Sequence, residues 1–358
     1  MGPALVHEIT ELAPDDDHAV VECGPGARIV TIPSPGFPLD RKYWYFDNEA
    51  AVRAALDAET PDFVEVSSPW RSPAMVARWP GQVPRSLIMH ADPLSAHAYR
   101  WLEPVLSRET IDRRFEPFCS HLRLMGRSYD WVVCASRELR GRLATGGVLN
   151  TALHPMGIEA GLFSPARRSQ LLRQKLLELC ELPESAHLLI GVGRLSAEKR
   201  WLLVVDAVTA ASQSRPIGLV IFGQGNQKHR ILRQIAGNPH IRIIKPELNR
   251  ANFAAILASA DALIYGCEAE TFCMAAAESR ASGIPLIIPD RGGAADHARG
   301  GAGRIYKAGN ALAAAHAISA FLAESRAILL SAPLTMLDHF SGLFSDYTGL
   351  AASQSRVA

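Results

Sequence analysis

Two glutamates with seven residues between them, Glu270 and Glu278, are the residues with the clearest capacity for chemistry. Eight positions along an α-helix make a little over two turns, so this spacing predicts both carboxylates on one side of a helix and its preceding loop. Ionised carboxylates bind sugar and ribose hydroxyls well, because charge-assisted hydrogen bonds are the stronger kind. Two acids on a solvated helix face fit the same spacing about equally well. An apolar run at 262–265 and a break at 281–285 enclose the pair and predict a strand–loop–helix–strand unit.

The segment upstream predicts a place for phosphate. An apolar run at 188–192 predicts a strand, a Gly-x-Gly turn follows it, and a helix is expected from about Trp201. Such a turn directs backbone N–H groups and the positive helix end toward a ligand above it. Arg194 and Lys199 flank the turn, and two cations there suit a diphosphate. Ser196 replaces the third glycine of a dinucleotide fingerprint, so the turn alone is weak evidence.

Five ordered motifs together resemble the family-four retaining glycosyltransferases, which use nucleotide-sugar donors. The motifs are Gly193–Lys199, Phe222–Gly225, Glu270–Glu278, Ala281–Pro285 and Asp290–Asp296. The resemblance implies the GT-B architecture, an α/β fold of two facing Rossmann-like domains. Stretches 34–38 and 61–67, with the histidine after the next expected strand, look most like the branch of GDP-mannose-dependent α-mannosyltransferases.

The resemblance also implies roles for individual residues. Arg194 and Lys199 would neutralise the donor diphosphate, and Glu278 would bind the ribose of the nucleotide. Glu270 and backbone amides near it would hold the transferred sugar. The residues expected to bind the donor are Gly193, Arg194, Lys199, Gly223, Gly225, Glu270, Thr271, Phe272, Cys273 and Glu278. The residues expected to act in catalysis are His90, Arg194, Lys199 and Glu270.

The first half of the chain predicts a second parallel sheet. Segments 61–70, 85–90 and 129–136 are expected to contain strands, with Ser136 as the N-cap of a helix. Ligands bind beyond the carboxyl ends of strands in such sheets, which places His90 where chemistry is expected. A lone histidine at a strand end is more often structural, and the family resemblance is what favours His90 as the residue that faces the donor sugar.

The start of the chain departs from the family. Such enzymes open with a strand, a Gly-rich loop and a first helix, whereas here Ala4–Ala13 carries Leu5, Ile9 and Leu12 at helical spacing. This pattern predicts the first helix and an absent first strand, with Gly2 as the remnant of the loop. A misplaced start, a shortened chain or a sheet without that strand would each explain it. An absent strand would expose sheet edges and weaken donor binding, which puts full activity in doubt.

Length and composition favour two domains. The chain has 358 residues, of which 48% are hydrophobic, enough for two cores. We expect an acceptor-binding domain at 1–155, a nucleotide-sugar-binding domain at 156–335, and a final helix at 336–358 that crosses back to the first domain. A net charge of +1 offers no reason to expect nucleic acid as a partner.

Cysteines and targeting signals indicate a reducing compartment. The six cysteines include no Cys-x-x-Cys pair and no His/Cys cluster, so neither zinc nor disulfides are expected. No signal peptide or membrane-spanning run is recognisable, and we expect a cytoplasmic protein. An arginine-rich, aromatic stretch at 100–127 leaves peripheral membrane contact open. Acids within that stretch favour a solvated or acceptor-facing helix instead.

These features predict a metal-independent, retaining hexosyltransferase without a cofactor. Its donor is expected to be GDP-mannose first and a UDP-hexose second, and its acceptor a glycan or a lipid-linked molecule. Two alternatives stay open: a non-catalytic sugar-nucleotide-binding subunit of a transferase pair, and a nucleotide-sugar epimerase or hydrolase on the same fold. Intact Arg194, Lys199, Glu270 and Glu278 argue against a non-catalytic relic.

Overall fold

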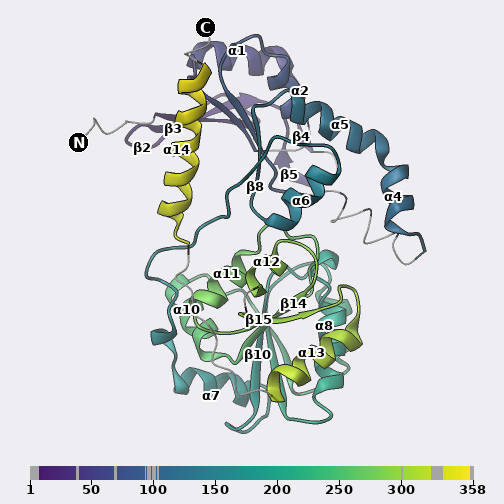
Figure 1. Cartoon of the computed structure of the whole chain (residues 1–358). Coiled ribbons are helices and arrows are strands. Elements are labelled where there is room, and N and C mark those ends of the chain that lie inside the picture. Colours follow the sequence, from purple (N-terminus) through teal and green to yellow (C-terminus); the bar gives the residue numbers. More distant parts are fainter. Residues whose placement is uncertain are drawn as a thin grey trace.

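The computed structural model describes residues 8–37, 40–67, 71–92, 94, 98, 102, 105–299, 301–323 and 334–354. Figure 1 shows two groups of elements, one from each half of the chain, joined by a few extended segments. The first group contains β1 (Ile9–Asp15), β2 (Val20–Gly24), β3 (Ala27–Pro33), β4 (Gly36–Phe37), β5 (Asp40–Trp44), α1 (Glu49–Glu59), β6 (Val64–Val66), α2 (Ser72–Ala77), β7 (Arg85–Ile88), α4 (Arg108–Arg114), α5 (Glu116–Arg127), β8 (Trp131–Cys134), α6 (Arg137–Thr145) and β9 (Thr151–Leu153).

The second group alternates strands and helices. It contains η2 (Pro165–Arg167), α7 (Gln170–Leu179), β10 (His187–Val192), η3 (Ala197–Lys199), α8 (Trp201–Ala211), β11 (Ile217–Phe222), α9 (Lys228–Ile235), β12 (Ile241–Ile244), α10 (Arg250–Ser259), β13 (Ala262–Ile264), α11 (Met274–Ala281), β14 (Leu286–Pro289), α12 (Ala294–Ala298), β15 (Gly303–Tyr306) and α13 (Ala311–Ala323). The last helix, α14 (Met336–Gln354), returns to the first group.

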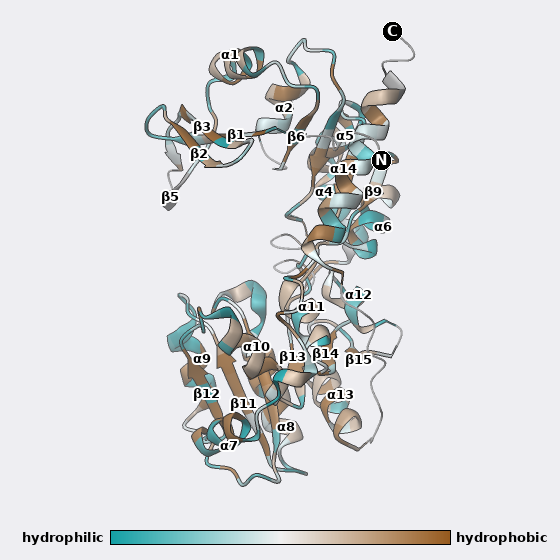
Figure 2. Ribbon diagram, turned by 90° about the vertical axis from the view of Figure 1, so that its left-hand side faces the viewer, coloured by the Kyte–Doolittle hydropathy of each residue, from teal (hydrophilic) through white to brown (hydrophobic). Residues whose placement is uncertain are grey.

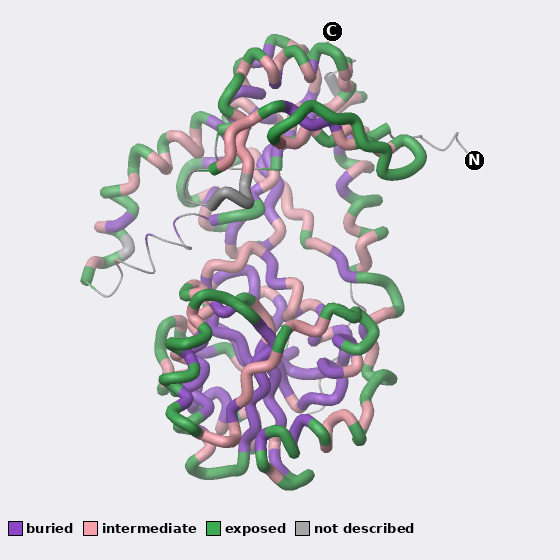
Figure 3. The backbone as a smooth tube through the Cα atoms, turned by 180° about the vertical axis from the view of Figure 1, so that it is seen from behind, coloured by how far each residue is buried: buried purple, intermediate pink, exposed green. Residues whose placement is uncertain are grey.

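The second group is a doubly wound parallel sheet. Its six strands lie in the order β12-β11-β10-β13-β14-β15, and every neighbouring pair is parallel. Helices α7, α10 and α11 contribute to the apolar core on one face, and α8, α9 and α13 to the core on the other. Because both faces are covered, the inner strands β11, β10, β13 and β14 are largely buried apolar runs, brown in Figure 2 and purple in Figure 3. The strand order reverses between β10 and β13, which is the topological switch point.

Four strands of the first group form a separate parallel sheet of order β6-β7-β8-β9. The predicted strands within 61–70, 85–90 and 129–136 are all present, and the Ser136 hydroxyl accepts a hydrogen bond from the backbone N–H of Leu139 as the N-cap of α6. No described strand pairs with the outer side of β6, which is one edge of this sheet.

The expected helix at Ala4–Ala13 is wrong wherever the structure describes this segment. Residues from Ile9 onward form β1, which pairs in parallel with β3 from Ile9 opposite Ala27 to Asp15 opposite Pro33. Leu12 packs against the core of the first group. Helical spacing over so few residues is a weak signal, and pairing with β3 satisfies the backbone groups of this stretch instead. Leu5 and Gly2 lie outside the described residues.

Helix α14 packs against the first group. Tyr347 of α14 stacks on Phe63, with ring centroids 4.1 Å apart, and its hydroxyl donates a hydrogen bond to Glu65 over 2.5 Å. Ser86 of β7 donates to the same hydroxyl over 2.9 Å. The domain boundary near residue 155 stays a prediction. Within the described residues, no helix combines the length and the apolar character needed to cross a membrane.

Candidate functional site

The loops that follow β10 and β13 meet at the switch point of the six-stranded sheet. Lys199 comes from the first loop and Glu270 from the second, and the Lys199 ammonium forms an ion pair with the Glu270 carboxylate. The same ammonium donates to the hydroxyl of Tyr265 over 2.8 Å, and this hydroxyl donates to Glu270 Oε1 over 2.6 Å. Two residues 71 positions apart are therefore joined because their strands are neighbours.

The side chains of this cluster are largely buried, and burial shifts their pKa values. The Lys199 side chain is 14% exposed and that of Glu270 21% exposed. Burial lowers the pKa of Lys199, but the opposing interactions, first among them that with the Glu270 carboxylate, together leave the net pKa raised. Burial also raises the pKa of Tyr265 well above its usual value. At neutral pH the Lys199 side chain is therefore an ammonium and Tyr265 a neutral phenol.

The loops at Gly193 and Gly223, both expected to bind the donor, pack on each other through glycine. A Cβ at Gly223 would lie 2.2 Å from the carbonyl oxygen of Gly193, so a side chain at this position has no room. The backbone N–H of Leu195 donates to the carbonyl of Gln224 over 2.8 Å and ties the loops together. Arg194 is 73% exposed and lies 3.1 Å from Glu198. Its guanidinium is therefore open to a ligand, whereas Lys199 is enclosed.

Glu278 has a different basic partner. It lies on α11, is 4% exposed, and accepts a hydrogen bond from Arg250 over 2.6 Å. The Arg250 guanidinium also pairs with Glu159 and lies 5.0 Å from the ring centroid of Phe163. Burial raises the pKa of Glu278, and Arg250 opposes that rise. The two glutamates thus contact different cations, and the binding of one ligand by both of them stays a prediction.

His90 lies beside the loop that carries Glu270. It follows β7 of the first group, and its backbone carbonyl accepts a hydrogen bond from the Thr271 hydroxyl over 3.0 Å. The backbone N–H of Arg137, the first residue of α6, donates to Asp296 of α12 over 2.5 Å. Figure 1 shows α11 and α12 on the side of the second group that faces the first. These contacts bring the predicted His90, Lys199 and Glu270 to one region between the two sheets.

The comparisons with known proteins agree with this geometry. Residues 175–330 match the family model of glycosyl transferases group 1. The chain is 30% identical over 285 residues to the GDP-mannose-dependent alpha-(1-6)-phosphatidylinositol dimannoside mannosyltransferase of Mycobacterium tuberculosis, covering 76% of this chain and 71% of the relative. The chain belongs to the group 1 glycosyltransferases.

Solved structures confirm the predicted GT-B fold of this glycosyltransferase. Sucrose-phosphate synthase from Thermosynechococcus elongatus superimposes with a TM-score of 0.67 at 16% identity, covering 98% of this chain and 88% of the other. Anabaena HepE in complex with UDP gives a TM-score of 0.60 at 16% identity, covering 86% of this chain and 81% of the other. At these identities the likeness shows the fold alone.

Three residues of the candidate site were missed by sequence reasoning. The sequence pattern assigns Tyr265 only to an expected strand. A tyrosine hydroxyl at the carboxyl end of an apolar run is the signal that could have indicated a site residue. Arg250 lies 28 positions from Glu278, and nothing in its local sequence connects the two. His297 follows the Asp290–Asp296 motif directly and was passed over.

His297 contacts the backbone of the loop that carries Phe272. Its Nε2 lies 2.9 Å from the carbonyl oxygen of Phe272, and because a carbonyl only accepts, Nε2 must carry the proton. The imidazole also meets the Phe272 ring edge-to-face at 4.6 Å between centroids. Burial lowers the pKa of His297 to about 4 from its usual 6.5. The ring is therefore neutral at physiological pH.

The glycosyltransferase is expected to lose stability in mild acid through His297. The pKa of His297 is lower in the folded protein than in the unfolded chain. Its contribution to the free energy of unfolding is therefore complete above about pH 6.5 and is lost as the pH falls toward about 4. Between about pH 7.5 and pH 5 the loss should be about 2 kcal/mol, at 1.36 kcal/mol per pKa unit. Denaturant unfolding of the wild type and of His297→Gln, which keeps an N–H donor, measures it. Equal pH dependence in both proteins would contradict the assignment.

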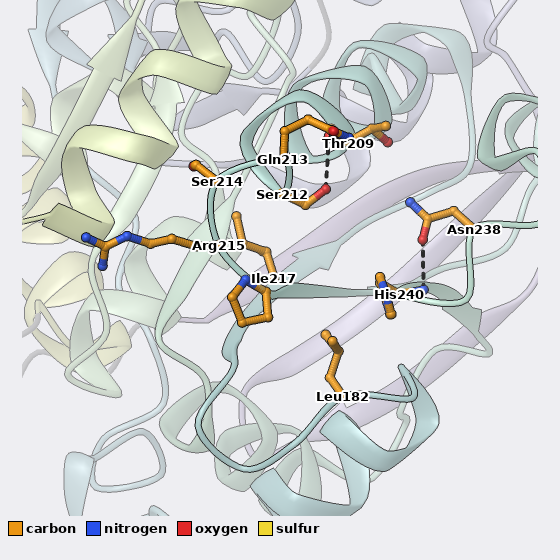
Figure 4. Close-up of a pocket in the computed structure, with 10 residues that line it drawn as sticks. Leu182, Thr209, Ser212, Gln213, Ser214, Arg215, Ile217, Asn238 and His240 are labelled. Atoms are coloured by element: carbon orange, nitrogen blue, oxygen red, sulfur yellow. Dashed lines mark hydrogen bonds between the residues drawn. The ribbon is translucent and has the colours of Figure 1, made fainter.

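A polar hollow lies away from all these residues. Figure 4 shows it at the amino ends of β11 and β12, lined by residues that include Thr209, Gln213, Arg215, Asn238 and His240. The residues predicted to bind the donor surround the carboxyl ends of β10, β11 and β13 instead. We therefore do not expect a nucleotide to bind in this hollow.

Proposed function

We propose that this glycosyltransferase moves a hexose, with mannose first, from a nucleotide-diphosphate sugar to a glycan or lipid-linked acceptor, with retention and without a metal ion. The observation that carries the proposal is the meeting of Lys199, Tyr265 and Glu270 at the switch point, where ligands bind in doubly wound sheets. GDP-mannose is placed first because the relative from Mycobacterium tuberculosis is named as a GDP-mannose-dependent mannosyltransferase. A UDP-hexose is the second choice.

The donor diphosphate is proposed to lie over the glycine loops at Gly193 and Gly223. Lys199 has three N–H donors, and its described contacts with Glu270 and Tyr265 occupy two of them. The third is then available to a phosphate oxygen, with the exposed guanidinium of Arg194 as a second cation. Fixed cations beside a leaving group stabilise the charge that develops in the transition state. This arrangement supplies the stabilisation without a metal ion.

The sugar and the nucleotide are proposed to extend in opposite directions from the diphosphate. Glu270 and the backbone amides of 271–273 would hold the hexose, with Gly225 near the diphosphate and His90 facing the sugar from the first group. Glu278 would accept a hydrogen bond from the ribose. The bond from the anomeric carbon to the phosphate oxygen breaks and the acceptor oxygen bonds to that carbon on the same face. The leaving phosphate oxygen takes the acceptor proton, so atoms and charge balance.

The division of labour between the two groups is part of the proposal. Residues 1–155 would bind the acceptor and residues 156–335 the donor. The final helix at 336–358 would cross back to the first domain. The contacts of α14 with β6 and β7 support the last point. The hydrogen bond from Thr271 to His90 supports the approach of both domains to one sugar.

The proposal is tested by incubating the purified protein with GDP-mannose, UDP-glucose and UDP-galactose. We expect slow release of the nucleotide diphosphate from GDP-mannose, faster release when methyl α-mannoside is added as an acceptor, and a disaccharide product with the α linkage. EDTA should leave the rate unchanged. Affinity without turnover would favour the non-catalytic subunit, and a new sugar nucleotide would favour the epimerase. A rate that EDTA abolishes would overturn the metal-independent part alone.

A further inference from the structure

Tyr265 stands out as a buried polar residue at the centre of the proposed donor site. It follows β13 directly, is 3% exposed, and contacts both members of the Lys199–Glu270 ion pair. The hydroxyl accepts from the ammonium and donates to the carboxylate, so both of its hydrogen-bonding functions are used. The ammonium also lies 5.4 Å from the centroid of the Tyr265 ring.

The contacts converge on one oxygen of the carboxylate. Both the Lys199 ammonium and the Tyr265 hydroxyl bond to Oε1 of Glu270. Two donors that approach Oε1 from different elements fix the rotation of the carboxylate about its last torsion, which is otherwise broad. The direction of Oε2 is then set by the contacts of Oε1, and no described hydrogen bond of Glu270 uses Oε2.

The position of Tyr265 is itself fixed by the sheet. Its backbone N–H donates to the carbonyl of Ile287 in β14 over 3.0 Å. Its carbonyl accepts from the buried hydroxyl of Tyr306 in β15 over 2.6 Å. The phenol therefore extends from a backbone held by two neighbouring strands, whereas Glu270 lies in a loop. A group on a rigid element can orient a group on a loop.

We propose that Tyr265 is a positioning residue for sugar transfer: its hydroxyl holds the Glu270 carboxylate in the orientation that the hexose requires. The inference rests on the proposed function and adds a residue to it. Removing the hydroxyl leaves the ion pair in place, so the charges stay compensated and the fold persists. Only the orientation of the Glu270 carboxylate is lost.

Tyr265→Phe tests this, with Tyr129→Phe as the matched control. Tyr129 is also buried and also bonds through its hydroxyl, to the carbonyl of Pro73 over 2.8 Å, but it lies in the first group. With GDP-mannose as the probe, Tyr265→Phe should lower kcat by roughly 10- to 100-fold, the usual effect of a hydrogen bond to a charged group. Its affinity for free GDP should stay within about twofold of the wild type. Tyr129→Phe should change neither quantity.

A double-mutant cycle separates positioning from simple stabilisation. If Tyr265 acts through Glu270, adding Tyr265→Phe to Glu270→Gln should lower kcat little beyond the effect of Glu270→Gln alone. Multiplicative losses, an unchanged kcat in Tyr265→Phe, or a parallel loss of GDP affinity and melting temperature would overturn the proposal.

A crystal structure of unliganded Tyr265→Phe distinguishes failure of this proposal from failure of the proposed function. We expect the Glu270 carboxylate to adopt a second orientation there, whatever the donor proves to be. An unchanged carboxylate would overturn the positioning role even if the wild type turns over GDP-mannose. A reoriented carboxylate in a protein whose wild type uses no nucleotide sugar would overturn the proposed function and leave the orienting contact established.

Discussion

Replacing Lys199 with alanine is expected to lower turnover of the nucleotide-sugar donor by about 10²–10³-fold, the usual loss when one electrostatic contact to a transition state is removed. Lys199 is the enclosed cation of the site, and its removal also leaves the Glu270 carboxylate without its ion pair. Enclosure strengthens the interaction because water screens it less. Steady-state release of GDP from GDP-mannose measures the effect.

Two controls accompany this variant. Arg194→Ala should cost less, because the Arg194 guanidinium is 73% exposed and water screens its charge. Lys175→Ala removes an exposed ammonium from α7 and should leave turnover unchanged. Circular dichroism should show the same fold in all three proteins. Near-normal turnover in Lys199→Ala, or an equal loss in Lys175→Ala, would contradict the proposed diphosphate site.

Replacing the two glutamates one at a time is expected to separate nucleotide binding from sugar binding. Glu278→Gln should weaken binding of free GDP by roughly 10- to 100-fold, because a hydrogen bond to a charged group contributes about 1.5–3 kcal/mol. Glu270→Gln should leave GDP binding nearly unchanged and lower turnover of the intact donor. In the structure Glu278 pairs with Arg250 and Glu270 with Lys199.

Calorimetry with free GDP decides between the two glutamates. Each variant is compared with the wild type and with Glu184→Gln, which changes an exposed acid outside the site. If Glu270→Gln binds GDP more weakly than Glu278→Gln, the roles assigned to the two carboxylates are wrong.

Much of the second group could be predicted from the sequence because its signals are local. The apolar run at 188–192, the glycine turn and the helix from Trp201 all follow from neighbouring residues, and β10 and α8 confirm them. Gly223 was expected from a motif to bind the donor. The structure adds the steric reason, since the Gly193 carbonyl leaves no room for a Cβ.

The partners within the site could not be predicted from the sequence, because they depend on which strands become neighbours. Lys199 meets Tyr265 and Glu270 only because β13 pairs with β10 across the switch point, and β11 and β12 separate the two along the chain. Arg250 reaches Glu278 from the start of another helix. At the start of the chain, pairing with β3 overrode the helical spacing of Ile9 and Leu12.

A crystal structure with bound GDP tests the central claim most directly. We predict the diphosphate over the loops at Gly193 and Gly223, within hydrogen-bonding distance of Lys199, and the ribose hydroxyls against the Glu278 carboxylate. GDP bound in the polar hollow at the amino ends of β11 and β12, or bound elsewhere with Lys199 and Glu278 untouched, would contradict the account.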